Sequence, residues 1–146
     1  MAAVLVGLPL PAAPAVPQPR LRRVFDAFCD TLVPADSLTP AASALGVPQT
    51  IVDDVAGDAM MQRLVSVACA WLDAQAGGEF AARDAESREA IVHRMAGMPW
   101  DSPQRRFFHL MRNTVMAEYY AQPLSWRGLA MDHPPQPMGF FDAVRP

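Results

Sequence analysis

The spacing of the prolines divides this sequence into three parts and limits the folds that it can adopt. Five of the fifteen prolines lie in the first 19 residues, and five more lie in the last 24. Proline removes a backbone donor and interrupts helices and sheets, so neither end favours regular structure. We therefore predict an Ala/Pro-rich arm over residues 1–19, a folded domain over 20–121 and an extended tail over 122–146.

The middle of the chain has apolar residues spaced by three and four positions rather than by two, which predicts α-helices and no strands. Asp58 and Asp84 are suitable N-caps, and Ser102 followed by Pro103 is a cap with proline at the first helical position. The helices that we expect are about 20–33, a short one near 48–55, 59–76, 85–96 and 103–121. The predicted fold class is all-α, a small bundle of about five helices.

The helix expected over 59–76 has the most regular apolar pattern. Its main stripe consists of Met60, Met61, Leu64, Val65, Ala68, Trp71 and Leu72. Val67, Cys69 and Ala70 widen this stripe nearly all round the helix, as in helices that are buried on every side. We therefore predict that it is the central helix of the bundle and that Trp71 lies in the core.

Composition excludes several classes of function. Hydrophobic residues make up 51% and charged residues 18%, which is apolar enough for a core. The net charge of −3 argues against nucleic acid, because phosphates require clustered positive charge. All twelve basic residues are arginines, so lysine Schiff-base chemistry and a P-loop lysine are excluded.

No residue pattern indicates catalysis, a cofactor or a metal. There is no nucleophile elbow and no glycine-rich dinucleotide loop. His93 and His109 lack a ligand partner three or four positions away, and we interpret both as residues of polar helix faces. Cys29 and Cys69 lie 40 positions apart among apolar neighbours, so free buried thiols are favoured and one disulfide remains open.

A short cluster of arginines opens the folded domain at Arg20, Arg22 and Arg23. We interpret it as a charged helix surface rather than an anion site, since acidic residues elsewhere offset it. Asp53 and Asp54 are adjacent on a helix and so point in different directions, unlike a catalytic pair of carboxylates.

The tail is apolar and aromatic, yet its prolines and glycines prevent a compact fold. Five of the twelve aromatic residues fall in the final 28 positions. Such a segment is stabilised when it is buried, either on a partner protein or on its own domain. We favour the partner, and the predicted contact residues are Tyr119, Tyr120, Trp126, Leu129, Met138, Phe140 and Phe141.

Several segments of this sequence, in their order along the chain, resemble the gluconate 2-dehydrogenase subunit 3 family. Phe25 to Asp36, with its Thr31-Leu32-Val33-Pro34-Ala35-Asp36 ending, resembles the start of the family pattern. The matching segments that follow are 44–54, 107–120, Trp126-Arg127-Gly128-Leu129 and 134–140. The resemblance covers residues 21–141.

The resemblance implies a non-catalytic small subunit of a periplasmic FAD-dependent sugar or alcohol dehydrogenase. The implied partner is a large flavoprotein of the glucose–methanol–choline oxidoreductase type, which holds the FAD, and a c-type cytochrome subunit often joins them. The small subunit would assist maturation of the large one and would often carry its twin-arginine export signal. Here Arg22-Arg23 follow the apolar stretch instead of preceding it, so a cytoplasmic location also remains open.

Two questions stay open at the level of sequence. The first sixteen residues resemble the second half of an export signal, with Ala13-Pro14-Ala15 in the form of a cleavage site, but they also suit a simple Ala/Pro arm. The alternative function is a stand-alone all-α ligand-binding or scaffold protein. Its pocket would be lined by Met60, Met61, Trp71 and Met111.

Overall fold

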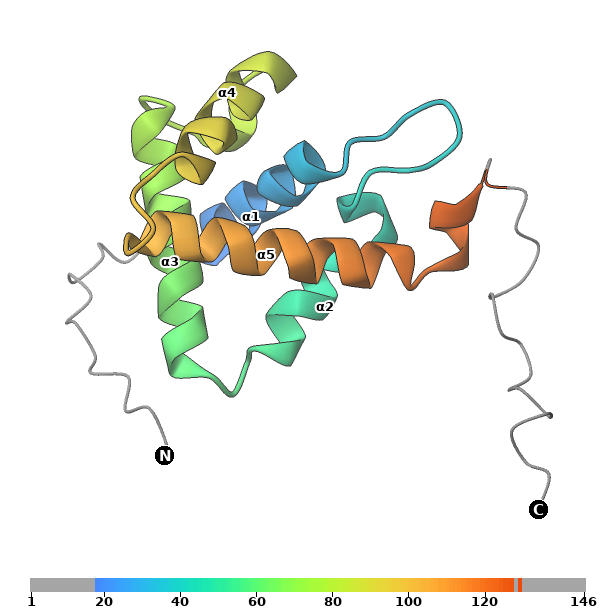
Figure 1. Ribbon diagram of the computed structural model, residues 1–146, viewed down its shortest axis with the longest axis horizontal. Coiled ribbons are helices and arrows are strands. Elements are labelled where there is room, and N and C mark those ends of the chain that lie inside the picture. The colour runs from blue at the N-terminus through green and yellow to red at the C-terminus, as the bar shows by residue number, and fades with distance from the viewer. Residues whose placement is uncertain (1–17, 128, 130–146) are drawn as a thin grey trace.

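The computed structural model describes residues 18–127 and residue 129 (Figure 1). Within this part of the chain 72% of the residues are helical and no strand is present, so the predicted all-α class is confirmed. The five α-helices are α1 (Gln18–Leu32), α2 (Val47–Asp54), α3 (Ala59–Gln75), α4 (Ala85–Ala96) and α5 (Pro103–Tyr120). Three short 3-10 helices join them, η1 (Ser43–Leu45), η2 (Phe80–Ala82) and η3 (Pro123–Trp126).

The helix ends follow the capping chemistry expected from the sequence. Asp58 accepts hydrogen bonds from the backbone N–H groups of Met60 and Met61 at the start of α3. The Asp84 carboxylate and the Ser102 hydroxyl cap α4 and α5 in the same way. Beyond the end of α3, the chain turns at a glycine, Gly77, with φ of 64°, a left-handed conformation that glycine adopts without strain.

Two helices, α1 and α5, each pack against all four of the other α-helices and so lie at the centre of the bundle, whereas α3 does not. The prediction that α3 is central is therefore wrong. One side of α3 does face the core, through Val65, Cys69 and Leu72, but Leu64 and Trp71 remain partly exposed. An apolar stripe wider than the available contact area leaves its edges in water, which periodicity alone does not reveal.

The core includes side chains of all five α-helices, and aromatic rings link α1 to α5, which crosses the molecule in front of α1 (Figure 1). Phe25 and Phe28 are fully buried, and their rings lie 6.5 and 5.1 Å from that of Phe107. These tilted and edge-on contacts are the arrangements that aromatic rings prefer. The first helix and the last are thus joined directly.

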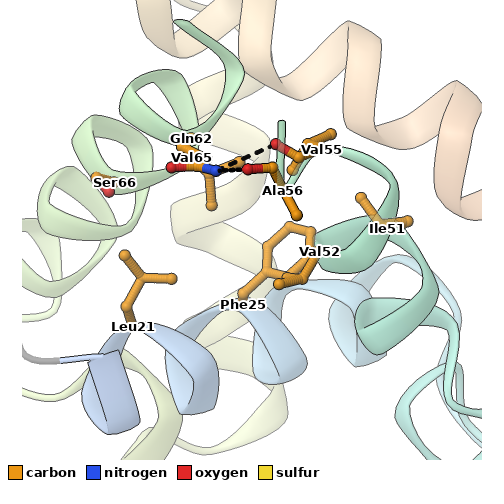
Figure 2. A pocket seen from close by; sticks show the side chains of 9 residues that line it. All are labelled: Leu21, Phe25, Ile51, Val52, Val55, Ala56, Gln62, Val65 and Ser66. Atoms are coloured by element: carbon orange, nitrogen blue, oxygen red, sulfur yellow. Dashed lines mark hydrogen bonds between the residues drawn. The ribbon is translucent and has the colours of Figure 1, made fainter. Parts of the chain in front are cut away.

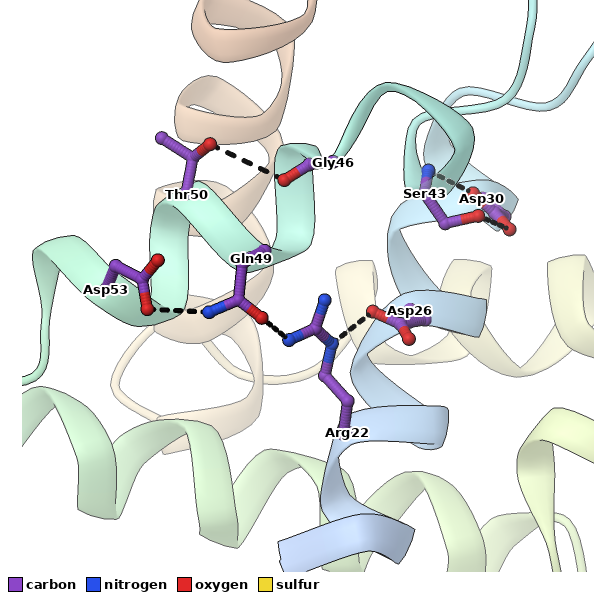
Figure 3. Close-up of polar contacts among 8 residues, drawn as sticks. All are labelled: Arg22, Asp26, Asp30, Ser43, Gly46, Gln49, Thr50 and Asp53. Atoms are coloured by element: carbon purple, nitrogen blue, oxygen red, sulfur yellow. Dashed lines mark hydrogen bonds and ion pairs between the residues drawn. The ribbon is translucent and has the colours of Figure 1, made fainter.

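Polar contacts account for all three arginines at the start of α1. Arg22 pairs with Asp26 at 2.7 Å and also donates to the Gln49 side chain of α2 (Figure 3). Arg20 pairs with Asp73 at 2.6 Å, and Arg23 with Glu79 at 2.8 Å. These pairs agree with a charged helix surface rather than an anion site.

A second polar contact in Figure 3 fixes the loop that follows α1. Asp30 accepts hydrogen bonds from both the backbone N–H and the hydroxyl of Ser43, each at 2.7 Å. The Asp30 carboxylate of α1 therefore fixes the C-terminal end of the loop over residues 33–42.

The first residues of the predicted tail pack on the helical domain. η3 lies against the end of α5, where Ser125 is buried and the Gln122 amide donates to the Leu45 carbonyl at 3.1 Å. The domain therefore extends past residue 121, because the hydrogen-bonding groups of 122–126 find partners on it. Of the arm predicted over 1–19, residues 18 and 19 belong to α1, and residues 1–17 lie outside the described part of the chain, as do residues 130–146.

Candidate partner-binding surface

A groove of about 460 Å³ lies at one end of the domain, between the loop after α1 and the end of α5. Its lining residues are Leu32, Val33, Pro34, Asp36, Leu38, Thr39, Met116, Tyr119, Tyr120, Ser125, Arg127 and Leu129. We call it the terminal groove. The two walls come from the beginning and the end of the folded chain, so they meet only through the tertiary fold.

The first wall is a tight turn built around Asp36. Its carboxylate accepts hydrogen bonds from the N–H groups of Leu38 at 2.7 Å and Thr39 at 2.6 Å, and from the Thr39 hydroxyl. These donors hold the pKa of Asp36 below its usual range, since they stabilise the ionised form. The turn fixes the backbone beneath Leu38, whose side chain is 56% exposed.

The second wall is the end of α5 together with η3. The Trp126 indole N–H donates to the Tyr120 carbonyl at 2.9 Å and closes the chain back on α5. Trp126 itself is partly buried, whereas Tyr120 and Leu129 are each more than half exposed. Together with Leu124 and Leu38, they place four exposed large apolar residues at this end of the domain.

Tyr119, also predicted as a partner contact, belongs to the core. It is only 2% exposed, and its ring meets that of Tyr120 edge-on at 5.2 Å. Its hydroxyl donates to the carbonyl oxygen of Pro40 at 2.7 Å. Little of the Tyr119 ring is therefore available to a partner, and its predicted role as a contact residue stays a prediction.

The other predicted contacts have different positions. Tyr120 and Leu129 line the terminal groove, and Trp126 supports it from the side. Met138, Phe140 and Phe141 lie outside the described residues. The sequence prediction missed Leu38, although one signal was present: an aliphatic residue in a loop, two positions after an aspartate that can cap the turn.

The candidate chemical groups of the described chain are two cysteines and two histidines. Cys29 and Cys69 are both buried and unpaired, which confirms the predicted free thiols. Burial raises the pKa of Cys29 well above its usual value and that of Cys69 to about 12, so both stay protonated. His93 is exposed on α4, and His109 packs between Trp100 and Phe108.

No group of three or more His, Cys, Asp or Glu side chains suited to a metal ion occurs among the described residues. None of the helices in that part of the chain combines the length and the apolar character needed to cross a bilayer.

A second cavity, of about 240 Å³, lies between α1, α2 and α3 (Figure 2). Leu21 and Phe25 face Ile51 and Val52 across it. The Gln62 amide closes one side by donating to the Ala56 carbonyl at 2.5 Å and, less closely, to that of Val55. Neither this cavity nor the terminal groove is lined by Met60, Met61, Trp71 or Met111, the residues expected for an internal ligand pocket.

The fold and these surfaces define a small helical protein with several exposed apolar side chains at one groove, as in proteins that work by contact with a partner. The family model for gluconate 2-dehydrogenase subunit 3 matches residues 20–131, and the chain belongs to this family. It is accordingly an accessory subunit of a dehydrogenase complex. Comparison with curated proteins and with solved structures gives no match.

Proposed function

We propose that this chain is the non-catalytic small subunit of an FAD-dependent sugar or alcohol dehydrogenase, and that it binds the catalytic flavoprotein and supports its maturation. The observation that carries the proposal is the terminal groove. Leu38, Tyr120 and Leu129 each leave more than half of a large apolar side chain in water around it. Burying such a side chain in an interface contributes about 1.5–3 kcal/mol.

The proposal assigns the chemistry to the partner. FAD and substrate belong to a large subunit of the glucose–methanol–choline oxidoreductase type, and a c-type cytochrome subunit completes the complex in our proposal. We place the complex in the periplasm, in line with the family resemblance. We expect the isolated small subunit to bind no flavin, haem or metal.

The test is co-expression with a candidate catalytic flavoprotein of the glucose–methanol–choline oxidoreductase type. We expect soluble flavoprotein with bound FAD only when the small subunit is present, and co-purification of the two. Leu38→Ser together with Leu129→Ser should weaken the complex strongly, whereas Met60→Ser serves as a control because Met60 is exposed on α3. A flavoprotein that matures equally well alone would contradict the proposal.

The second candidate is a stand-alone ligand-binding or scaffold protein, and the cavity between α1, α2 and α3 favours it. Its walls are mostly apolar, so its ligand would be a small hydrophobic molecule. A rise in melting temperature with such a ligand, abolished by Val52→Trp, would support this function. An unchanged melting temperature across apolar probes would leave the subunit role as the function.

A further inference from the structure

Trp100 is the most exposed aromatic residue among the described ones, and its ring is nevertheless fixed. It lies in the turn between α4 and α5, and 67% of it is exposed. The guanidinium carbon of Arg105 stands 4.8 Å from the centre of the Trp100 ring. The His109 ring lies at 4.9 Å with an interplanar angle of 57°.

The side chains that contact Trp100 are themselves fixed by further contacts. Arg105 donates to the Met98 carbonyl at 3.0 Å and to Nε2 of His109 at 3.4 Å. Phe108 meets the His109 ring edge-on at 5.4 Å. The Trp100 ring has therefore already lost its conformational freedom in the folded domain. Binding of a partner to this ring would then cost less conformational entropy.

A role in folding alone does not account for this arrangement. A tryptophan that stabilises a helix corner does so by burying its ring, because the gain follows the apolar area removed from water. Trp100 leaves two thirds of its surface in water. Rigid, exposed tryptophans of this kind are the residues that dominate binding energy when an interface covers them.

The surface beside Trp100 carries positive charge. Arg105 and Arg112 are seven positions apart and so lie on one face of α5, with Arg106 exposed on the adjoining face. In the described part of the chain, no ion pair involves Arg105, Arg106 or Arg112, whereas the arginines at the start of α1 are all paired. Asp101 is the one acidic residue among positions 98–112.

We infer that Trp100, Arg105, Arg106 and Arg112 form a second contact surface, and that it binds an acidic segment of the catalytic subunit of the dehydrogenase complex. The inference rests on the proposed function and extends it. Charge complementarity selects this occupant, because arginines that are not paired with a carboxylate of their own domain attract carboxylates of a partner. A second copy of this chain, paired symmetrically through the same surface, would set arginines against arginines.

The surface is separate from the terminal groove. Arg105 and Tyr120 lie at opposite ends of α5, about 22 Å apart along a helix that rises 1.5 Å per residue (Figure 1). Substitutions at the two places should therefore act independently on binding.

The test compares the affinity of the full-length chain and its variants for the purified catalytic subunit. Trp100→Ala should raise Kd by about 30-fold or more. The double variant R106E/R112E should lower the association rate by about tenfold at low salt and flatten its salt dependence. Both exposed arginines can change without loss of fold, which circular dichroism and the melting temperature would verify.

Two matched variants complete the design. Met60→Ala removes an equally exposed apolar side chain from α3, and R106K/R112K keeps the charge, so both should bind as the wild type does. If the wild type binds and the Trp100 and R106E/R112E variants bind equally well, the inference fails while the proposed function stands. If the wild-type chain does not bind the catalytic subunit, both fail together.

Discussion

The hydroxyl of Tyr119 donates a hydrogen bond to the carbonyl oxygen of Pro40 over 2.7 Å, and this bond joins segments 79 positions apart. Tyr119 belongs to the last turn of α5, and Pro40 to the loop that follows α1. The same two segments form the walls of the terminal groove. The buried side chain of Tyr119 thus connects the two walls of the groove to each other and to the core of the domain.

Tyr119→Phe should therefore weaken the domain and the groove together. The ring and its packing remain, but a buried hydrogen bond is lost, which costs about 0.5–1.5 kcal/mol of unfolding free energy. Urea denaturation followed by circular dichroism measures this loss. Tyr120→Phe is the matched control, since about half of Tyr120 is exposed, and equal stabilities for the two variants would contradict the expectation.

Asp73 should matter more to stability than its partner Arg20. Asp73 is buried and accepts hydrogen bonds from Arg20 and from the backbone N–H of Phe80 at 2.9 Å. Asp73→Ala leaves that buried N–H without its acceptor, so we expect a loss of about 1–3 kcal/mol. Arg20→Gln should cost less, because the arginine side chain is 42% exposed and the Phe80 contact survives. A larger loss for Arg20→Gln than for Asp73→Ala would overturn this order.

The two cysteines should be unreactive in the folded chain. Burial raises the pKa of Cys29 and Cys69, so both remain neutral thiols in the native state while they ionise near pH 9 in the unfolded one. Stability is therefore fully present below pH 9 and is lost as pH rises above it, by up to about 1.4 kcal/mol per pH unit for each thiol. A disulfide-exchange reagent should label neither thiol until denaturant is added, and Cys69→Ala should reduce the alkaline loss of stability. Rapid labelling of native protein would show that a thiol is accessible.

Phe28→Ala should destabilise the domain more than Trp71→Ala. Phe28 is fully buried between α1 and α5, so its loss should cost about 3–5 kcal/mol of unfolding free energy. Trp71 is only partly buried on α3, and we expect less than about 3 kcal/mol for its replacement. Thermal denaturation of both variants gives the comparison, and a lower melting temperature for Trp71→Ala than for Phe28→Ala would contradict this order.

The sequence predicts local features of this fold but not which helix lies at its centre. Spacing and capping chemistry predicted the five helices and the caps at Asp58, Asp84 and Ser102, because both act within a few residues. Which helix becomes central depends on how the apolar stripes of all five meet. The stripe of α3 was the most regular, yet the helices in contact with all the others are α1 and α5.

The terminal groove likewise contains some residues that the sequence predicts and one that it does not. Tyr120, Trp126 and Leu129 were predicted from the aromatic and apolar content of the chain end, and they do lie at or beside the groove. Leu38 was not predicted, because its place opposite Tyr120 results from the hydrogen bond between Tyr119 and Pro40 and from the turn at Asp36. No local pattern in the sequence contains that long-range pairing.

The last prediction concerns residues 130–146, which we expect to anchor the subunit on the flavoprotein. A chain ending at Leu129 keeps η3 and the terminal groove but lacks Met138, Phe140 and Phe141. It should retain its helical circular dichroism and melting temperature while its affinity for the flavoprotein falls. A chain ending at Ala121 should lose stability as well, because the bonds of Gln122 and Trp126 to the domain are then removed.

Point variants set the size of that effect. Trp126→Ala and Phe140→Ala should each weaken binding by about 2 kcal/mol, and together about a thousandfold if the two losses add. Calorimetric titration of each variant with the flavoprotein measures this. Wild-type affinity in the chain ending at Leu129 would assign the interface to the helical domain alone, and loss of its helical signal would show that the tail completes the core of this subunit.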